Sequence, residues 1–277
     1  MLSETLPLNL RARSQRGRRA PVHQTALRPG VEGASSPRRV VSLPRALSKL
    51  GLCSRAQALD LIEAGRVAVN GRVSKDATLR VSLEDDRISV DGQAAARARE
   101  PLLIALHKPT GYVTTRTDPQ GRKTVYDLLP KLDRFVFPVG RLDKETSGLL
   151  IVTDDHRLGE ALTNPDAQVL KTYDVAVDRP PDAEAIESLR RGLEIGKGER
   201  TRPAIVSELG DGPRLRITIH EGKNRQIRRM MAAVGLSVVS LRRTAIGGLE
   251  LGMLPSGEHR LLSPAERELL LGRRASG

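Results

Sequence analysis

Short blocks of hydrophobic and polar positions predict a compact α+β module over residues 42–95. A helix is predicted over residues 45–50. A second helix begins after Ser54, which has Gln57 three residues later in a capping-box pattern, and it ends at Gly65. The apolar positions that we expect on one face of this helix are Ala58, Leu59 and Ile62.

A hairpin and a further strand follow these two helices. Asn70 and Gly71 stand between β-branched residues, which is the strongest short-range signal for a tight β-turn. Ile88 and Val90 then mark a strand. The order helix, helix, hairpin, strand predicts a small domain with its own core.

The longer segment over residues 101–265 mixes strand and helix signals in irregular order. Its predicted strands are the apolar segments 102–106, 135–139 and 149–153 and the alternating segments 169–177 and 215–219. Its predicted helices are 157–162, 182–189, 224–234 and one that begins at Ser263 and Pro264. Because strands neither alternate strictly with helices nor stand alone, we expect a mixed, mostly antiparallel sheet flanked by helices.

The remaining segments are expected to lie outside these two domains. Residues 1–41 form a basic arm, whose first 40 residues hold 8 Arg, no Lys and 2 acidic residues without periodicity. Residues 96–100 form a linker, and residues 266–277 form the end of the last helix and a tail. An arm rich in arginine and poor in acids favours a disordered phosphate-binding segment, with an organelle transit peptide as the alternative.

The charge balance indicates that the protein binds polyanions. The 277 residues include 46 Lys and Arg against 33 Asp and Glu, which gives a net charge of +13. Such a field attracts nucleic acid whatever the fold. With 3 Tyr, 2 Phe and no Trp, the chain is poorly suited to aromatic stacking platforms for single strands.

Metal, disulfide and membrane functions are disfavoured. Cys53 is the single cysteine, and the five histidines show no zinc-ligand spacing, so we expect neither a metal nor a cofactor. The longest uncharged apolar stretch, residues 230–241, has 12 residues, too few to cross a bilayer.

The module over residues 42–95 carries an excess of positive charge on its helices and hairpin. Its sequence R-A-L-S-K-L-G-L-C-S-R-A-Q-A…I-E-A-G-R-V-A-V-N-G resembles the S-four, or alpha-L, RNA-binding domain. The simpler alternative is that these charges are only solvated. The residues that we predict to contact RNA here are Arg45, Lys49, Arg55, Arg66 and Arg72.

Asp143 is the first candidate for chemistry, because it lies on a polar turn between two buried strands. Catalytic residues are often held on such loops, although an aspartate can also simply cap the turn. Arg141 and Lys144 flank it and favour the ionised carboxylate. An ionised aspartate can act as a nucleophile or a base.

A second candidate segment, residues 221–243, concentrates positive charge without any acidic residue after Glu221. Its like charges need an external anion or an internal carboxylate. On a helix, Arg225 and Arg229 would share a face with Arg228 beside them. We predict phosphate contacts for Arg225, Arg229 and Arg242. Tyr173, on an alternating strand, is a third candidate, with a core position as its alternative.

Four strings occur in a characteristic order: H-K-P-T-G-Y-V-T-T from His107, G-R-L-D-K-E-T-S-G-L-L from Gly140, K-T-Y from Lys171 and E-G-K-N-R-Q-I-R-R-M from Glu221. Together with the module in front, they resemble the ribosomal RNA pseudouridine synthases of the RsuA/RluB/RluE/RluF type. The resemblance covers about residues 42–265. It implies an isomerase that converts uridine to pseudouridine in ribosomal RNA without a cofactor.

The resemblance also implies a role for individual residues. Asp143 would be the catalytic aspartate, attacking either the base or the ribose C1′ of a flipped-out uridine. Tyr173 would stack on the uracil, Arg228 would pair with the aspartate, and Ile227 would pack near the base. Arg141 would fill the space that the uridine leaves.

Two other classes of protein are alternatives to this one. A non-catalytic RNA-binding or ribosome-assembly factor would not need a carboxylate where phosphates approach, and a nuclease or deaminase would need metal ligands or an acid–base pair. The string N-R-Q-I-R-R-M favours large-subunit over small-subunit RNA, free or in a ribosome assembly intermediate. We expect a monomer in the bacterial cytoplasm.

Overall fold

The computed structural model describes residues 40–94, 100–210 and 212–272. Residues 1–39 of the predicted basic arm, residues 96–99 of the predicted linker and residues 273–277 of the predicted tail therefore fall outside the described residues. Val40 and Val41, which were expected in the arm, lie instead in a strand. Among the residues that are described, no helix is both long and apolar enough to cross a bilayer.

The module at the N-terminal end is built around two helices, α1 (Leu43–Lys49) and α2 (Arg55–Glu63), as predicted. Both hydrogen bonds of the Ser54–Gln57 capping box are present. Ala58 and Ile62 are buried, whereas Leu59 is about half exposed, so the prediction that all three share one face is wrong for Leu59. Residues at positions i and i+4 share a helix face, and Leu59 lies one position round from that face.

Two small sheets complete this module. The four-stranded sheet has the order β3-β2-β5-β6, and the other pairs β1 with β4. Asn70 and Gly71 both have positive φ, at 51° and 79°, as the predicted tight hairpin turn requires. The strands are β1 (Val40–Ser42), β2 (Val67–Val69), β3 (Arg72–Val73), β4 (Arg80–Ser82), β5 (Ile88–Val90) and β6 (Gln93–Ala94).

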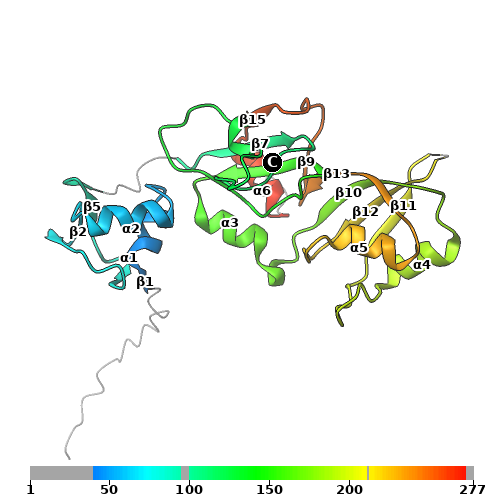
Figure 1. Ribbon diagram of the computed structural model, residues 1–277, viewed down its shortest axis with the longest axis horizontal. Coiled ribbons are helices and arrows are strands. Elements are labelled where there is room, and N and C mark those ends of the chain that lie inside the picture. Colours follow the sequence, from blue (N-terminus) through cyan, green and yellow to red (C-terminus); the bar gives the residue numbers. More distant parts are fainter. Residues whose placement is uncertain (1–39, 95–99, 211, 273–277) are drawn as a thin grey trace, which may run out of the picture. The chain divides into compact units, whose positions relative to one another are not determined.

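The longer segment forms one mixed sheet with the path β11-β12-β10-β13-β9-β7-β15 (Figure 1). β13 and β9 run parallel, and the other described pairs in this sheet are antiparallel, which confirms the α+β class. Its strands are β7 (Leu103–Lys108), β8 (Phe137–Pro138), β9 (Ser147–Thr153), β10 (Lys171–Val177), β11 (Ile205–Glu208), β12 (Arg214–Ile219), β13 (Val238–Ile246), β14 (Leu249–Glu250) and β15 (His259–Leu261).

Helices cover this sheet in two groups. α4 (Ala183–Arg191) and α5 (Gln226–Ala233) pack on β10 to β13 through a core that includes Leu189, Met230 and Met231. α3 (His156–Thr163) and α6 (Pro264–Leu270) pack on β7 and β9. Two short 3₁₀ helices, Val125–Leu128 and Pro165–Ala167, lie in the connections.

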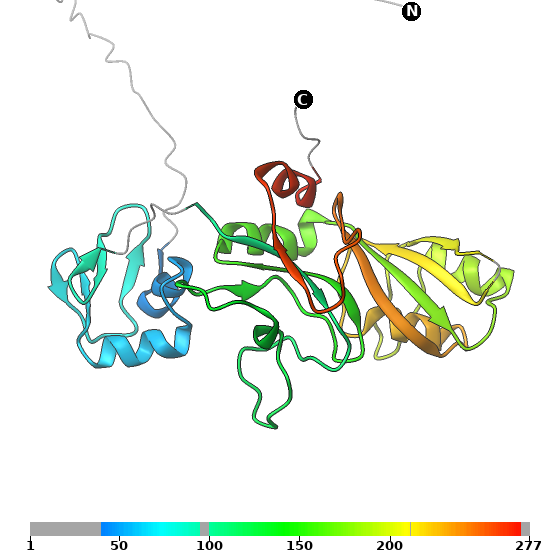
Figure 2. The same cartoon turned by 90° about the horizontal axis from the view of Figure 1, so that it is seen from above.

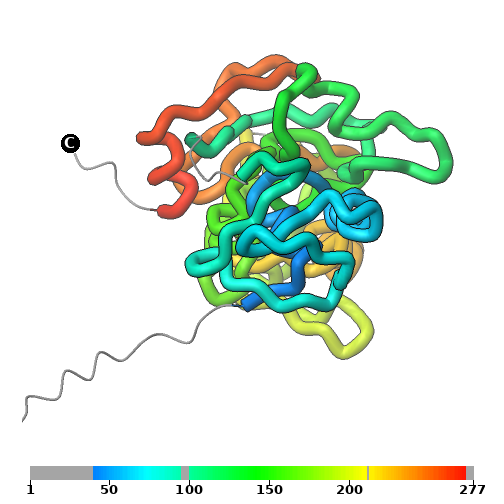
Figure 3. The backbone as a smooth tube through the Cα atoms, turned by 90° about the vertical axis from the view of Figure 1, so that its left-hand side faces the viewer, coloured from blue at the N-terminus to red at the C-terminus, as the bar shows by residue number. Residues whose placement is uncertain are grey.

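Strands β7 and β9 are buried on both faces, which explains the apolar segments 102–106 and 149–152. Leu149 and Ile151 face the core shared with α3 and α6, whereas Leu150 and Val152 face the opposite side. That opposite side is covered by the long connection over residues 109–136, part of which extends away from the sheet as a green loop (Figures 2 and 3). The connection from β8 to β9, which carries Asp143, is thereby anchored between buried elements.

Candidate active site

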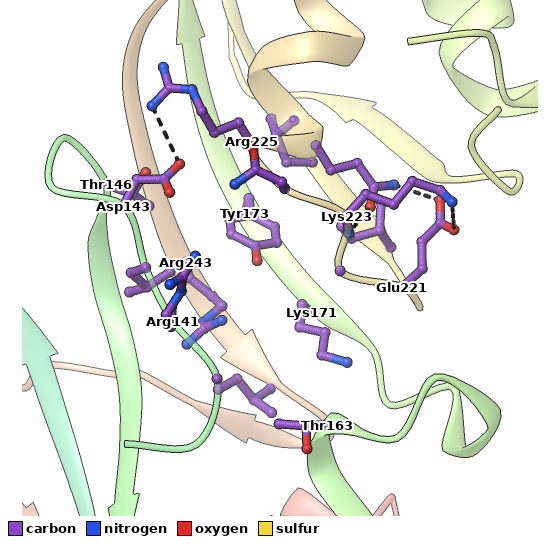
Figure 4. Close-up of a pocket in the computed structure, with 18 of the residues that line it drawn as sticks. Arg141, Asp143, Thr146, Thr163, Lys171, Tyr173, Glu221, Lys223, Arg225 and Arg243 are labelled. Atoms are coloured by element: carbon purple, nitrogen blue, oxygen red, sulfur yellow. Dashed lines mark hydrogen bonds and ion pairs between the residues drawn. The ribbon is translucent and has the colours of Figure 1, made fainter. Parts of the chain in front are cut away.

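A cleft of about 380 Å³ opens where β9, β10 and β13 meet the start of α5 (Figure 4). It is lined by the predicted residues Arg141, Asp143, Tyr173, Ile227 and Arg228, together with Arg225. Segments from three separate parts of the sequence therefore contribute to one site. Among the described residues, no cluster of three or more His, Cys, Asp or Glu side chains could hold a metal ion.

Lys108 anchors the loop that carries Asp143 through hydrogen bonds. This lysine is fully buried, and its ammonium group donates hydrogen bonds to the carbonyl oxygens of Pro109 at 3.0 Å, Asp143 at 3.0 Å and Thr146 at 2.7 Å. An ammonium group has three donors, so all of them are used. Lys108, which sequence reasoning did not single out, thus fixes the backbone on both sides of the Asp143 turn.

Close packing of β9 on β13 brings the Asp143 loop next to the central strand. Gly148 has φ of +110°, and a Cβ atom there would lie 2.2 Å from the carbonyl oxygen of Arg243. A side chain at this position would separate the two strands, so the glycine of the T-S-G string is required by their contact.

The ion-pair partner of Asp143 differs from the one that the resemblance implied. An Arg225 guanidinium nitrogen lies 3.7 Å from a carboxylate oxygen of Asp143 and also 3.7 Å from Glu145, and Figure 4 shows Arg225 facing Asp143. Arg228 instead donates to the carbonyl oxygen of Glu145 at 2.9 Å. The expected Arg228–Asp143 pair is therefore not the pair found in the described part of the chain.

Backbone conformation explains this exchange of partners. The predicted helix over 224–234 begins only at Gln226, and Arg225 is its N-cap residue, with a left-handed φ of 48°. The side chain therefore does not lie on the helix face that it was expected to share with Arg229. It turns instead toward the Asp143 loop, so Arg225 belongs to the cleft.

Two of the other predicted phosphate contacts have internal partners. Arg229 donates to Glu199 at 2.6 Å and to the carbonyl oxygens of Ile195 and Gly196, so it anchors that loop. Arg242 is half exposed and bonds to Asp174 at 3.2 Å, as does Arg216 at 2.8 Å. Internal carboxylates thus balance these charges.

The predicted RNA-binding residues of the small module differ in their surroundings. Arg66 forms a two-point contact with Asp91 through bonds of 2.9 and 2.5 Å, which makes it structural. Arg55, at the start of α2, and Arg72, in the hairpin, are exposed. Arg45 and Lys49 lie on α1. The RNA contacts of these residues stay predictions.

Lys171 and Arg243 are cleft residues that the sequence analysis did not assign. Burial, and then the nearby Arg243 charge, lower the pKa of Lys171 from 10.5 to about 8. Arg243 is 5% exposed and lies opposite Tyr173 in the pairing of β13 with β10. A sequence signal existed for Lys171, which lies in the K-T-Y string of the predicted strand over residues 169–177. Arg243 gave no such signal, because it interrupts the apolar pattern of its strand.

Lys171→Met is expected to stabilise the protein at pH 7 by about 2 kcal/mol, because it removes a half-buried charge. The folded-state pKa of about 8 lies below the unfolded value of 10.5, so the unfolded chain binds more protons between these values. Wild-type free energy of unfolding should therefore rise from pH 8 to 10.5, and the rise should shrink in the variant. Urea unfolding across this range measures both effects, with exposed Lys123→Met as the control. An unchanged or lower stability at pH 7 would contradict the assignment.

Comparisons with known proteins give the family of the chain. Residues 102–233 match the family model described as RNA pseudouridylate synthase, and residues 41–95 match the S4 domain. "Ribosomal large subunit pseudouridine synthase B" of Bacillus subtilis is 36% identical over 229 residues, which cover 81% of this chain and 93% of that protein. The protein of the same name from Vibrio cholerae is 38% identical, over 78% of this chain and 69% of that one.

Solved structures give the same result. A structure titled "Crystal structure of pseudouridylate synthase" matches with a TM-score of 0.61 and 30% identity, covering 83% of this chain and 99% of that one. The fold and the cleft thus define an RNA-modifying isomerase with an attached RNA-binding domain. The chain belongs to the RNA pseudouridylate synthase family.

Proposed function

We propose that this enzyme converts a uridine of large-subunit ribosomal RNA to pseudouridine, with Asp143 as the catalytic aspartate. The observation that carries the proposal is the Asp143 carboxylate in the cleft, ion-paired to Arg225 at 3.7 Å and held by a loop that Lys108 anchors. The relatives named above as ribosomal large subunit pseudouridine synthases support the choice of RNA. Their bacterial sources support action in the cytoplasm. The monomeric state stays a prediction.

In the proposed reaction a uridine leaves its helix and enters the cleft, which costs a few kcal/mol of stacking and pairing. Tyr173 would stack on the uracil, and Ile227, buried at the start of α5, would pack beside it. Arg225 pairs with the Asp143 carboxylate, which would attack the base or C1′. Arg141, exposed beside the cleft, is placed to fill the position that the uridine leaves.

The test of the RNA target is a map of pseudouridines in ribosomal RNA from cells with and without the gene. One site in large-subunit RNA should disappear and return when the wild-type gene is supplied, but not with Asp143→Asn. Loss of a site only in small-subunit or transfer RNA would show that the proposed target is wrong.

Arg225→Gln is expected to lower the single-turnover rate about tenfold, because the Asp143 carboxylate loses its ion-pair partner. Affinity for RNA should change less than threefold. Arg228→Gln, at a residue bonded to a backbone carbonyl in the same cleft, is the matched comparison. If Arg228→Gln lowered the rate while Arg225→Gln did not, the pairing implied by the family resemblance would hold during catalysis.

The small domain is proposed to supply affinity through phosphate contacts. Arg55→Ala combined with Arg72→Ala should weaken RNA binding and reduce the slope of log K against log salt by about 1 to 2, since up to two phosphates lose their partner. Filter binding at several salt concentrations measures the slope. Exposed Arg191→Ala, on α4, is the control, and an equal loss there would mean that only net charge matters.

A further inference from the structure

Arg243 is a buried arginine with an unused hydrogen-bond donor. Its Nε atom donates to the carbonyl oxygen of Leu149 at 2.8 Å, while one terminal nitrogen, Nη2, is buried without a hydrogen-bond partner in the described part of the chain. The residue is 5% exposed. A buried donor that lacks an acceptor carries a free-energy cost, which is larger when the donor is charged. A buried donor without a partner is typical of a group that binds a ligand.

Strand register places this guanidinium group beside the predicted stacking position. Arg243 on β13 pairs directly with Tyr173 on β10, so both side chains lie on the same face of the sheet. Both line the cleft, and Figure 4 shows Arg243 next to Arg141 and below Asp143. Arg242, the preceding residue, alternates to the other face, where it bonds to Asp174.

The surroundings favour a negatively charged ligand at this position. Lys171 lies two residues before Tyr173 on the same face of β10, and burial together with the Arg243 charge lowers its pKa to about 8. Among the described residues Arg243 forms no ion pair with a carboxylate, whereas Asp143 is paired with Arg225. A nearly buried guanidinium group directly opposite Tyr173 is suited to bind a base that stacks on that tyrosine. RNA phosphates are expected on the exposed rim.

We propose that Arg243 donates a hydrogen bond to a carbonyl oxygen of the uracil and stabilises the negative charge on the base when its bond to the ribose breaks. This inference rests on the proposed function. The C1′–N1 bond breaks with its electron pair on the base, where the charge spreads over N1 and the carbonyl oxygens. C5 then bonds to C1′, the C5 proton leaves and N1 gains a proton, so the isomerisation needs no co-reactant.

The test compares Arg243→Lys and Arg243→Gln with the wild type on an RNA that the wild type modifies. Pseudouridine formation by the wild type, and its absence in Asp143→Asn, checks the proposed function separately. Single-turnover rates should fall about 100-fold in both Arg243 variants, which is the effect of losing one donor to a developing anion. The dissociation constant for RNA should stay within twofold. Arg190→Lys, which removes a guanidinium bonded to the carbonyl of Val206 outside the cleft, is the control.

A second substrate separates charge stabilisation from a structural effect. In RNA with 5-fluorouridine at the target, fluorine withdraws electrons and makes the departing base a more stable anion. The loss caused by Arg243→Lys, followed as consumption of 5-fluorouridine in digested RNA, should then be at least fivefold smaller. An equal loss on both substrates would overturn the proposal. A normal chemical rate with weaker, salt-dependent binding would also overturn it and would make Arg243 a phosphate contact.

Discussion

Asp143→Asn is expected to abolish pseudouridine formation, with a loss of at least about 1,000-fold in the single-turnover rate. The amide keeps the shape of the side chain but removes the charge that attacks the uridine and pairs with Arg225. Release of tritium from RNA labelled at C5 of uridine measures the reaction. RNA affinity, measured by filter binding, should remain within about threefold of wild type because the phosphate-contacting surface is unchanged.

Asp127→Asn is the matched control for this prediction. Asp127 is also an aspartate in the catalytic segment, but it caps a 3₁₀ helix by accepting a bond from the Thr124 backbone. Its replacement should lower stability modestly and leave the chemical rate measurable. Residual turnover above a few per cent in Asp143→Asn would show that Asp143 is not the catalytic aspartate.

Lys108→Met is expected to destabilise the protein by about 3 kcal/mol, because three carbonyl oxygens lose their donor in a buried position. The Asp143 loop would also lose its anchor, so the single-turnover rate should fall at least tenfold well below the melting temperature. Urea unfolding measures the first effect and single-turnover kinetics the second.

Lys171→Met provides an internal comparison. Burial lowers the pKa of both lysines to about 8, so both charges oppose folding at neutral pH. Lys108 donates to three carbonyl groups, whereas no such bond is found for Lys171 among the described residues. The two substitutions should therefore change stability in opposite directions. If Lys108→Met stabilised the protein, the three hydrogen bonds would contribute less than the cost of burying the charge.

Local sequence signals determined much of the fold. The Ser54–Gln57 capping box and the Asn70–Gly71 turn each depend on residues within a few positions of one another, and both are present. The apolar sequence of β9 and the polar turn before it located Asp143 in the same way. These interactions are short-range, so the sequence carries them without knowledge of the rest of the chain.

Only the tertiary structure decided which charges belong to the site. β13 was not predicted, because Arg242 and Arg243 interrupt its apolar pattern, yet it is the strand that joins β9 to β10. Its register buries Arg243 opposite Tyr173, and the left-handed backbone of Arg225 turns that residue toward Asp143. Burial and ion pairing of a charge depend on contacts between residues about 70 to 80 positions apart, which no local pattern encodes.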